Sequence, residues 1–165
     1  MNSYCGYTSD FSIGGTSLHA AARSQFARNA AREIDSEKMT AFWAAIERRF
    51  AELMTLEANW DGYGGIAVKR ENIAFARSML SNICGPDSPK PQIVPGPAGD
   101  LQVEWHTIEG DLELHVLRPN KVSVWFDKAA ENDTREIELT SDFKTVAVWL
   151  EEITEAEFAA ELAAA

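Results

Sequence analysis

The spacing of apolar residues divides the chain into a first half with helical periodicity and a second half where apolar and polar residues alternate. The clearest helical pattern lies at 36–57, where Ser36 is placed to cap the start. The core-facing spacing of three, four and seven is carried there by Met39, Phe42, Trp43, Ile46, Phe50, Leu53 and Met54. Weaker patterns predict an Ala- and Arg-rich helix at 17–34 and a further helix at 69–82, which Gly85-Pro86 ends.

From Leu101 the apolar period becomes two, which is typical of antiparallel strands that bury one face. The first two strands flank Glu109-Gly110, a pair that predicts a two-residue hairpin loop. This loop would pair residues whose numbers sum to 219, so that Trp105 faces Leu114. A shift of one residue would bury polar side chains, so the alternation constrains the register.

Two more strands are expected at 121–127 and 134–140. In the first of them, Trp125 competes for the core with the apolar residues on the other side of the strand, Val122, Val124 and Phe126. Residues 86–99 are rich in proline and predict an extended connector with turns. The sheet is therefore predicted to be a four-stranded antiparallel meander.

Residues 142–153 return to helical spacing with Asp142 as the cap, and Thr154-x-x-Glu157 is a capping box that would open a short tail helix. This order predicts an α+β fold, with the N-terminal helices packed on one face of the meander, C-terminal helices after it, and the other face solvated and acidic. We expect residues 1–34 to form a flexible start and an Ala- and Arg-rich arm helix, either a docking arm or an ordinary packed helix. Residues 35–165 would form a single α+β domain with an acidic C-terminal half.

The net charge of −11 lies entirely in the second part of the chain. Residues 1–98 hold ten acidic and ten basic side chains, whereas 99–165 hold sixteen acidic and five basic ones, and 5 − 16 gives −11. Such a surface repels nucleic acid and anionic lipid and attracts basic surfaces. The candidate partner-binding face consists of acidic residues on or beside the strands: Glu104, Glu113, Asp127, Glu131, Asp133, Glu136 and Glu138. The alternative is that this charge only maintains solubility.

The outer side of the first two strands also holds candidate chemistry. In the predicted register Glu104 faces His115 and His106 faces Glu113, and such pairs could bind a metal or move protons. The simpler interpretation is ordinary cross-strand pairing. The sequence contains no catalytic or nucleotide-binding motif, so we assign no catalytic residue, no metal ligand and no cofactor.

The two cysteines, Cys5 and Cys84, are far apart and have no ligand-like spacing. This favours a reducing compartment over a disulfide framework or a zinc site. No apolar run has the length of a membrane span, and the first thirty residues lack the apolar stretch of a signal peptide. A cytoplasmic location is therefore expected.

The glycine-rich run Asn59-Trp60-Asp61-Gly62-Tyr63-Gly64, followed by Gly65, predicts a rigid turn between two helices. Glycine permits positive φ angles. Trp60 and Tyr63 are expected to pack and to hydrogen-bond through their polar tips. Asp61 precedes a glycine in a turn, so we expect it to bond its own backbone rather than act as a catalytic acid or metal ligand.

Two motifs resemble those of small bacterial and phage- or plasmid-encoded proteins of mostly unassigned function. They are Leu53-x-x-Leu56-x-x-Asn59-Trp60-Asp61-Gly62-Tyr63-Gly64 and Pro91-x-Ile93-x-Pro95-x-Pro97-x-Gly99-x-Leu101-x-Val103-Glu104-Trp105. The resemblance covers roughly residues 43–153, and it departs at Gly65-Ile66-Ala67, where the family usually has Ala and Pro. It implies a bacterial or mobile-element origin and an α+β domain, and it implies no established reaction.

These observations favour a non-catalytic acidic protein-binding module over an enzyme. The expected partner is a protein with a basic surface, such as a nuclease or CRISPR effector complex of host defence, which the module would inhibit in the manner of an anti-CRISPR or anti-restriction protein. The alternatives are an antitoxin or immunity partner of a toxin, and a small metal-dependent enzyme that uses the Glu/His face. A homodimer is compatible with the sequence.

Overall fold

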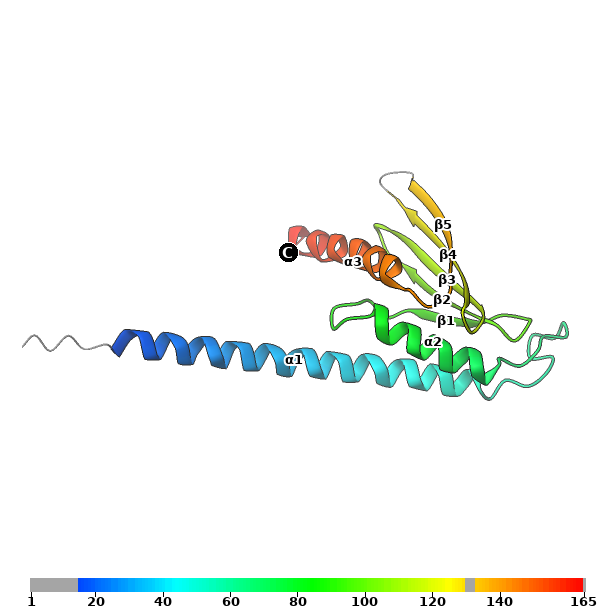
Figure 1. The fold of residues 1–165 in the computed structure, drawn as a ribbon, viewed down its shortest axis with the longest axis horizontal. Helices are drawn as coiled ribbons and strands as arrows, with labels where there is room; N and C mark the ends of the chain where they lie inside the picture. Colours follow the sequence, from blue (N-terminus) through cyan, green and yellow to red (C-terminus); the bar gives the residue numbers. More distant parts are fainter. Residues whose placement is uncertain (1–14, 130–132, 165) are drawn as a thin grey trace, which may run out of the picture.

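The computed structural model describes residues 15–129 and 133–164, which form three helices and one antiparallel sheet (Figure 1). In chain order the elements are α1 (Gly15–Leu53), α2 (Arg70–Ile83), β1 (Gln92–Pro95), β2 (Leu101–His106), β3 (Gly110–Arg118), β4 (Lys121–Lys128), β5 (Asp133–Leu139) and α3 (Lys144–Ala164). The sheet order is β1-β2-β3-β4-β5, so each strand pairs with its neighbours in the sequence. The predicted α+β class and the meander are confirmed, but the sheet has five strands and not four.

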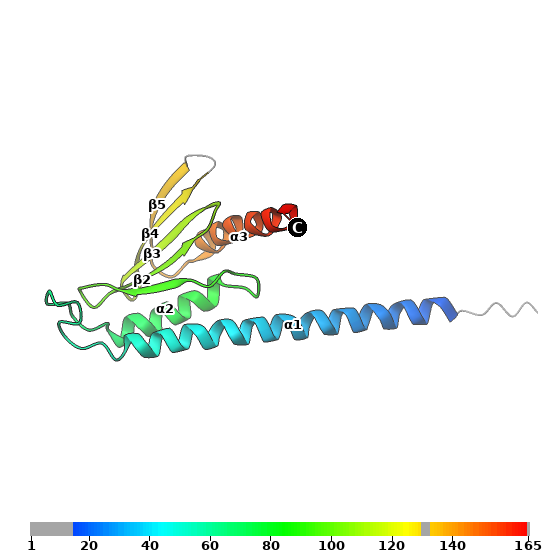
Figure 2. The same ribbon diagram turned by 180° about the vertical axis from the view of Figure 1, so that it is seen from behind.

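Helices α2 and α3 cover one face of the sheet (Figures 1 and 2). The opposite face, which we call the outer face, is covered by no element of the described chain. Helix α1 runs beside α2, to which it is joined by a two-point ion pair between Arg77 and Glu47, with an Nη2–Oε2 distance of 2.6 Å. The arginine also lies over the ring of Phe50. Residues 15–37 of α1, which we call the arm, extend past the rest of the fold.

Strand β1 lies inside the segment predicted to be a connector. Its one proline, Pro95, is tolerated because β1 is an edge strand, which forms ladder hydrogen bonds on one side only. The side chain of Ile93 is buried in the core, while its carbonyl accepts a hydrogen bond from Nε of Arg49 on α1 at 2.8 Å. Helix α1 therefore closes the edge of the sheet at β1.

Helix α1 is continuous, so the separate helices predicted at 17–34 and 36–57 are wrong. The prediction placed a cap at Ser36, but its carbonyl accepts from the Thr40 hydroxyl within the helix, and neither glycine nor proline interrupts the chain there. In the same way α3 runs through Thr154, whose hydroxyl bonds the Leu150 carbonyl instead of capping a new helix. The cap at Asp142 is confirmed by its hydrogen bond from the Lys144 amide.

The flexible start predicted for residues 1–16 lies outside the described residues, apart from its last two positions, which belong to α1. Among the described helices, none combines the length and the apolar content that a membrane span requires.

The core lies between the inner face of the sheet and the three helices. Trp105 is buried there and donates its indole N–H to the carbonyl of Pro89 at 2.8 Å. On β4 the competition for the core is resolved against Trp125, which is half-buried on the outer face, while Phe126 is fully buried and stacks on Trp149 at 5.0 Å between ring centroids. The other inner positions of β2, β3 and β4 are Leu101, Val103, Leu112, Leu114, Val116, Val122 and Val124.

The β2–β3 hairpin has the predicted faces but a different register. Paired residue numbers sum to 217, not 219, because the loop is Ile108-Glu109 and is closed by a hydrogen bond from the Thr107 amide to the Gly110 carbonyl at 3.0 Å. A shift of two residues leaves every side chain on its own face, so the alternation cannot detect it. Gly110 is not a loop residue: a Cβ there would collide with the carbonyl of Asp127 on β4.

Candidate protein-binding face

The outer face gathers the acidic residues singled out in the sequence. Five of them occupy outward positions on β2 to β5, as the strand register shows: Glu104, Glu113, Asp127, Glu136 and Glu138. Glu131 and the side chain of Asp133, also predicted for this face, lie outside what the structure describes. The face is therefore acidic over four adjacent strands.

Trp125 sits in the middle of one row that crosses these strands. The row runs Glu104, Glu113, Trp125 and Glu136, and each residue is the direct partner of the next. The indole therefore has a carboxylate on the strand at either side. Within the same row Glu104 and Glu113 face each other directly, and like charges in that relation destabilise a sheet.

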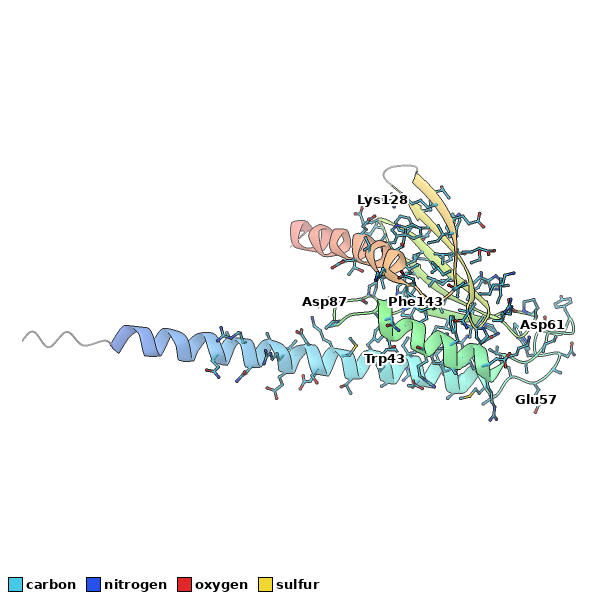
Figure 3. The ribbon with its side chains drawn as sticks, in the orientation of Figure 1. Trp43, Glu57, Asp61, Asp87, Lys128 and Phe143 are labelled. Atoms are coloured by element: carbon cyan, nitrogen blue, oxygen red, sulfur yellow. The ribbon has the colours of Figure 1, made fainter. Side chains whose placement is uncertain are left out.

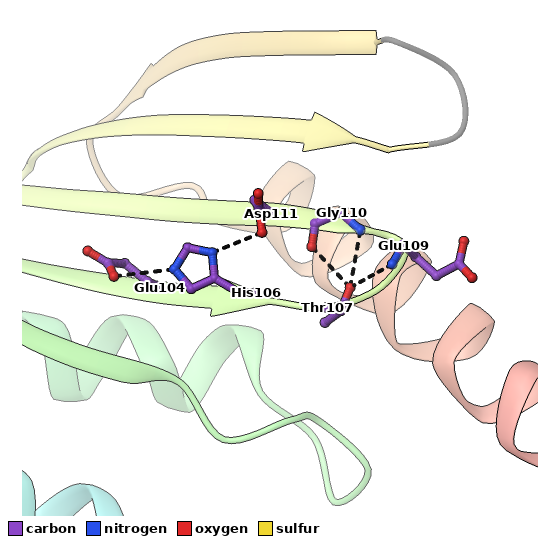
Figure 4. Close-up of polar contacts among 6 residues, drawn as sticks. All are labelled: Glu104, His106, Thr107, Glu109, Gly110 and Asp111. Carbon is purple, nitrogen blue, oxygen red and sulfur yellow. Dashed lines mark hydrogen bonds and ion pairs between the residues drawn. The ribbon is translucent and has the colours of Figure 1, made fainter.

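A second row of outward residues, near the hairpin loop, also contains two carboxylates that face each other. His106 is paired with Asp111, and Asp111 directly faces Asp127 on the next strand. The imidazole lies between two carboxylates, with Nδ1 2.9 Å from Oδ1 of Asp111 and Nε2 3.4 Å from Oε2 of Glu104 (Figure 4). Asp127 accepts a hydrogen bond from the Thr134 hydroxyl at 2.8 Å.

The predicted pairs of Glu104 with His115 and of His106 with Glu113 are both wrong. The two-residue change in register places Glu113 opposite Glu104, and Asp111 opposite His106. Asp111 was not among the predicted site residues, because only the correct hairpin loop brings it beside the imidazole. Within the described part of the chain, no three His, Cys, Asp or Glu side chains are grouped so that they could hold a metal ion.

The pKa of His106 is raised above its ordinary value of 6.5, chiefly by the hydrogen bond to Asp111 and further by Glu104. We therefore expect NMR titration of the imidazole to give a pKa above 6.5, and Asp111→Asn to lower it. The raised pKa means that protonated His106 stabilises the fold below pH 6.5, and that this contribution is lost as the pH rises through the folded-state pKa. A pKa at or below 6.5 in the unmodified protein would contradict this geometry.

His115 has a different partner, Asp100, which the sequence analysis missed. The Asp100 side chain is buried at the start of β2, where it bonds Nε2 of His115 and accepts from the Ala98 amide at 2.9 Å. Burial by itself would raise the pKa of Asp100, but the hydrogen bonds from His115 and the backbone outweigh it and lower the pKa. A Cβ at Gly96 would collide with this carboxylate, so the glycine makes room for it. The pair fastens the turn before β2 to β3.

The glycine-rich turn between α1 and α2 is held together by hydrogen bonds between its own side chains and backbone. The carboxylate of Asp61 accepts from the amides of Tyr63 and Gly65 at 2.9 and 2.8 Å, which lowers the pKa of this group. Asn59 has a φ of 68° and accepts from the Gly64 amide through its side chain at 2.8 Å. The expectation that Asp61 bonds its own backbone is confirmed. Figure 3 shows Asp61 at the end of the molecule opposite the arm.

The two aromatic residues of this turn behave differently. Trp60 is half-buried and donates its indole N–H to the Ile66 carbonyl at 3.2 Å, as expected. Tyr63 is 95% exposed, so the prediction that it packs in the turn is wrong. Its backbone amide is bound by the Asp61 carboxylate, while its side chain stands in solvent. The turn is tied to the sheet by the hydrogen bond from the Ile66 amide to Pro97 at 2.8 Å.

In comparisons with protein-family models, curated proteins and solved structures, the chain shows no match.

Proposed function

We propose that this protein is a binding module whose outer face docks on a basic surface of another protein. The observation that carries the proposal is the pair of facing carboxylates on adjacent strands, Glu104 with Glu113 and Asp111 with Asp127, in a face that no described element covers. Folding alone favours opposite or neutral cross-strand pairs. A face that keeps like charges together is less stable by itself and gains the most from a cationic partner.

Trp125 supports an arginine-bearing surface in particular. A guanidinium stacks on an aromatic face through a cation–π interaction and forms two-point hydrogen bonds to carboxylates. Glu113 and Glu136 stand at either side of the indole, so an arginine that stacks there has an acceptor on both adjacent strands. Proteins that hold nucleic acid carry such surfaces, and for this reason we propose a nucleic-acid-binding complex of host defence as the partner, inhibited by occlusion.

The test is inhibition of purified bacterial defence nucleases, with binding measured at low and high salt. We expect the unmodified protein to bind its target and block DNA cleavage, with an association rate that falls steeply as salt is added. The double change Glu113→Lys/Glu136→Lys should weaken binding about ten-fold or more, because it reverses the charge at both sides of Trp125. Binding that does not depend on salt, or no effect of the double change, would reject the outer face as the interface.

A matched control separates the face from net charge. Glu57→Lys/Glu151→Lys changes the net charge by the same amount at two exposed carboxylates outside the sheet. This variant should keep most of the affinity. If both double variants lose binding equally, the attraction is a property of the whole molecule and not of this face.

A further inference from the structure

A cleft of about 350 Å³ lies between α1 and the edge strand β1. The half-buried side chains of Ala45 and Val94 give it apolar walls. The charged side chains that line it are Arg48, Arg49 and Glu52 on α1 and Lys90 just before β1. A small-molecule site commonly has this form, with an apolar cleft of a few hundred Å³ and a few charged groups that converge on it.

The charge of this cleft is opposite to that of the molecule as a whole. Three cations and one carboxylate give its lining a net charge of +2, whereas the protein carries −11. Arg48 and Lys90 are exposed, and neither forms an ion pair with any residue that the structure describes. The cleft therefore offers two positive charges that the fold does not neutralise.

Arg49 is the positioned member of the three cations. Its Nε donates to the Ile93 carbonyl at 2.8 Å, and its Nη1 donates to Oε2 of Glu52 at 3.0 Å. A guanidinium has five N–H donors, so Arg49 keeps donors for a further acceptor while these two bonds hold it at the edge of the sheet. The fold thus places a fixed cation between two mobile ones.

The positive lining selects an anion, and the charge of the remaining surface limits its size. A nucleic acid or an anionic membrane extends beyond a cleft of this volume and meets acidic surfaces, which repel it. A small anion inside the cleft is less affected, because charges farther away than about 10 Å are largely screened by salt. Arginine matches two oxygens of a phosphate and lysine acts as a point charge for another, whereas a carboxylate has only two oxygens for three cations.

We propose that this cleft binds the phosphate group of a small phosphate monoester, whose apolar part lies between Ala45 and Val94. Arg49 receives the phosphate in a fixed position, and Arg48 and Lys90 close on its other oxygens. The ligand joins α1 to the segment that leads into β1. None of the charged residues of the cleft belongs to the outer face, so this proposal stands or fails independently of the proposed function.

NMR titration of the full chain with phenyl phosphate, at constant ionic strength, tests the site. We expect saturable shifts of the backbone amides of residues 45–52 and 90–94. Inorganic phosphate lacks the apolar part and benzoate lacks the third oxygen, so both should bind more weakly. The absence of saturable shifts up to about 10 mM phenyl phosphate, or equal or tighter binding of either other anion, would overturn the proposal.

Two double variants separate the cleft from general attraction of anions. Arg48→Gln/Lys90→Gln should weaken phenyl phosphate binding about ten-fold or more, because it removes two charged donors. Arg118→Gln/Lys144→Gln is the matched control, since it removes one arginine and one lysine at exposed positions outside the cleft. The control should keep the affinity of the unmodified protein. Equal losses in the two variants would contradict a site between α1 and β1.

Glu52→Gln should have the opposite effect. The Glu52 carboxylate repels an anion and occupies part of the Arg49 guanidinium, so its removal should tighten phenyl phosphate binding about two- to five-fold, as expected for one exposed charge pair. The same NMR titration measures the change. A loss of affinity in this variant would contradict a ligand that competes with Glu52 for the guanidinium.

Discussion

Replacing Trp105 by alanine is expected to lower the free energy of unfolding by about 4 kcal/mol, within the range found for buried Trp to Ala changes. The side chain is 2% exposed, so the change leaves a large cavity between the sheet and the helices. It also removes the hydrogen bond that the indole N–H donates to the Pro89 carbonyl, with an Nε1–O distance of 2.8 Å. Denaturant unfolding followed by circular dichroism measures the difference.

Trp125→Ala is the control for this experiment, because it removes the same side chain from the opposite face of the sheet, on β4 instead of β2. Trp125 is half-buried, so we expect a loss of about 1 kcal/mol and a much larger loss of partner binding. The two tryptophans thus separate stability from recognition. Equal losses of stability would mean that the assignment of inner and outer faces on β4 is wrong.

Replacing Asp100 by asparagine is expected to lower the free energy of unfolding by about 2 to 3 kcal/mol. Asparagine has nearly the same shape, but it lacks the charge, and one of its two donor hydrogens would point at the Ala98 amide or at the His115 ring. The carboxylate is 5% exposed, so water cannot replace what is lost. Asp127→Asn, at a half-buried position that faces another carboxylate, should change stability by less than about 0.5 kcal/mol.

The same substitution predicts a change in acid sensitivity. Because the folded-state pKa of Asp100 lies below its ordinary value of 3.8, ionised Asp100 stabilises the fold above that pH, and the contribution is lost as the pH falls through the folded-state pKa. In the asparagine variant, the loss of stability at acid pH that comes from protonation of Asp100 should be absent. If stability profiles of the two proteins stay parallel between neutral and acid pH, the hydrogen bonds to Asp100 do not favour its charged form.

The faces of the strands could be predicted from the sequence, because alternation reports directly which side chains are buried. The register in which the strands pair could not be predicted, because a shift of two residues preserves that alternation. Gly110 indicated the wrong loop, since a glycine needed for close approach of two strands looks the same in a sequence as a glycine needed in a turn. The predicted histidine partners were wrong for this reason alone, while the acidic character of the face did not depend on register.

Other features depend on contacts between distant segments. Strand β1 contains proline and becomes a strand only because β2 offers a partner on one side and Arg49 closes the other. Asn72 is fully buried at the start of α2, where it donates to the Gly99 carbonyl at 2.9 Å, and its polarity gave no indication of that position. Asp100 lies in a segment without periodicity, and the nearby Gly96, which leaves room for its carboxylate, was its only signal.

The two edges of the sheet also bear on how the protein avoids aggregation. An uncovered edge strand can pair with the edge of another molecule and begin a growing chain of sheets. At β1 this is prevented by α1, through the bond from Arg49 to the Ile93 carbonyl. At β5, which ends the sheet in the described part of the chain, four of the seven residues are charged, Arg135, Glu136 and Glu138 among them. Strand-to-strand stacking of copies is thereby disfavoured at both ends, and concentrated solutions should resist fibril formation.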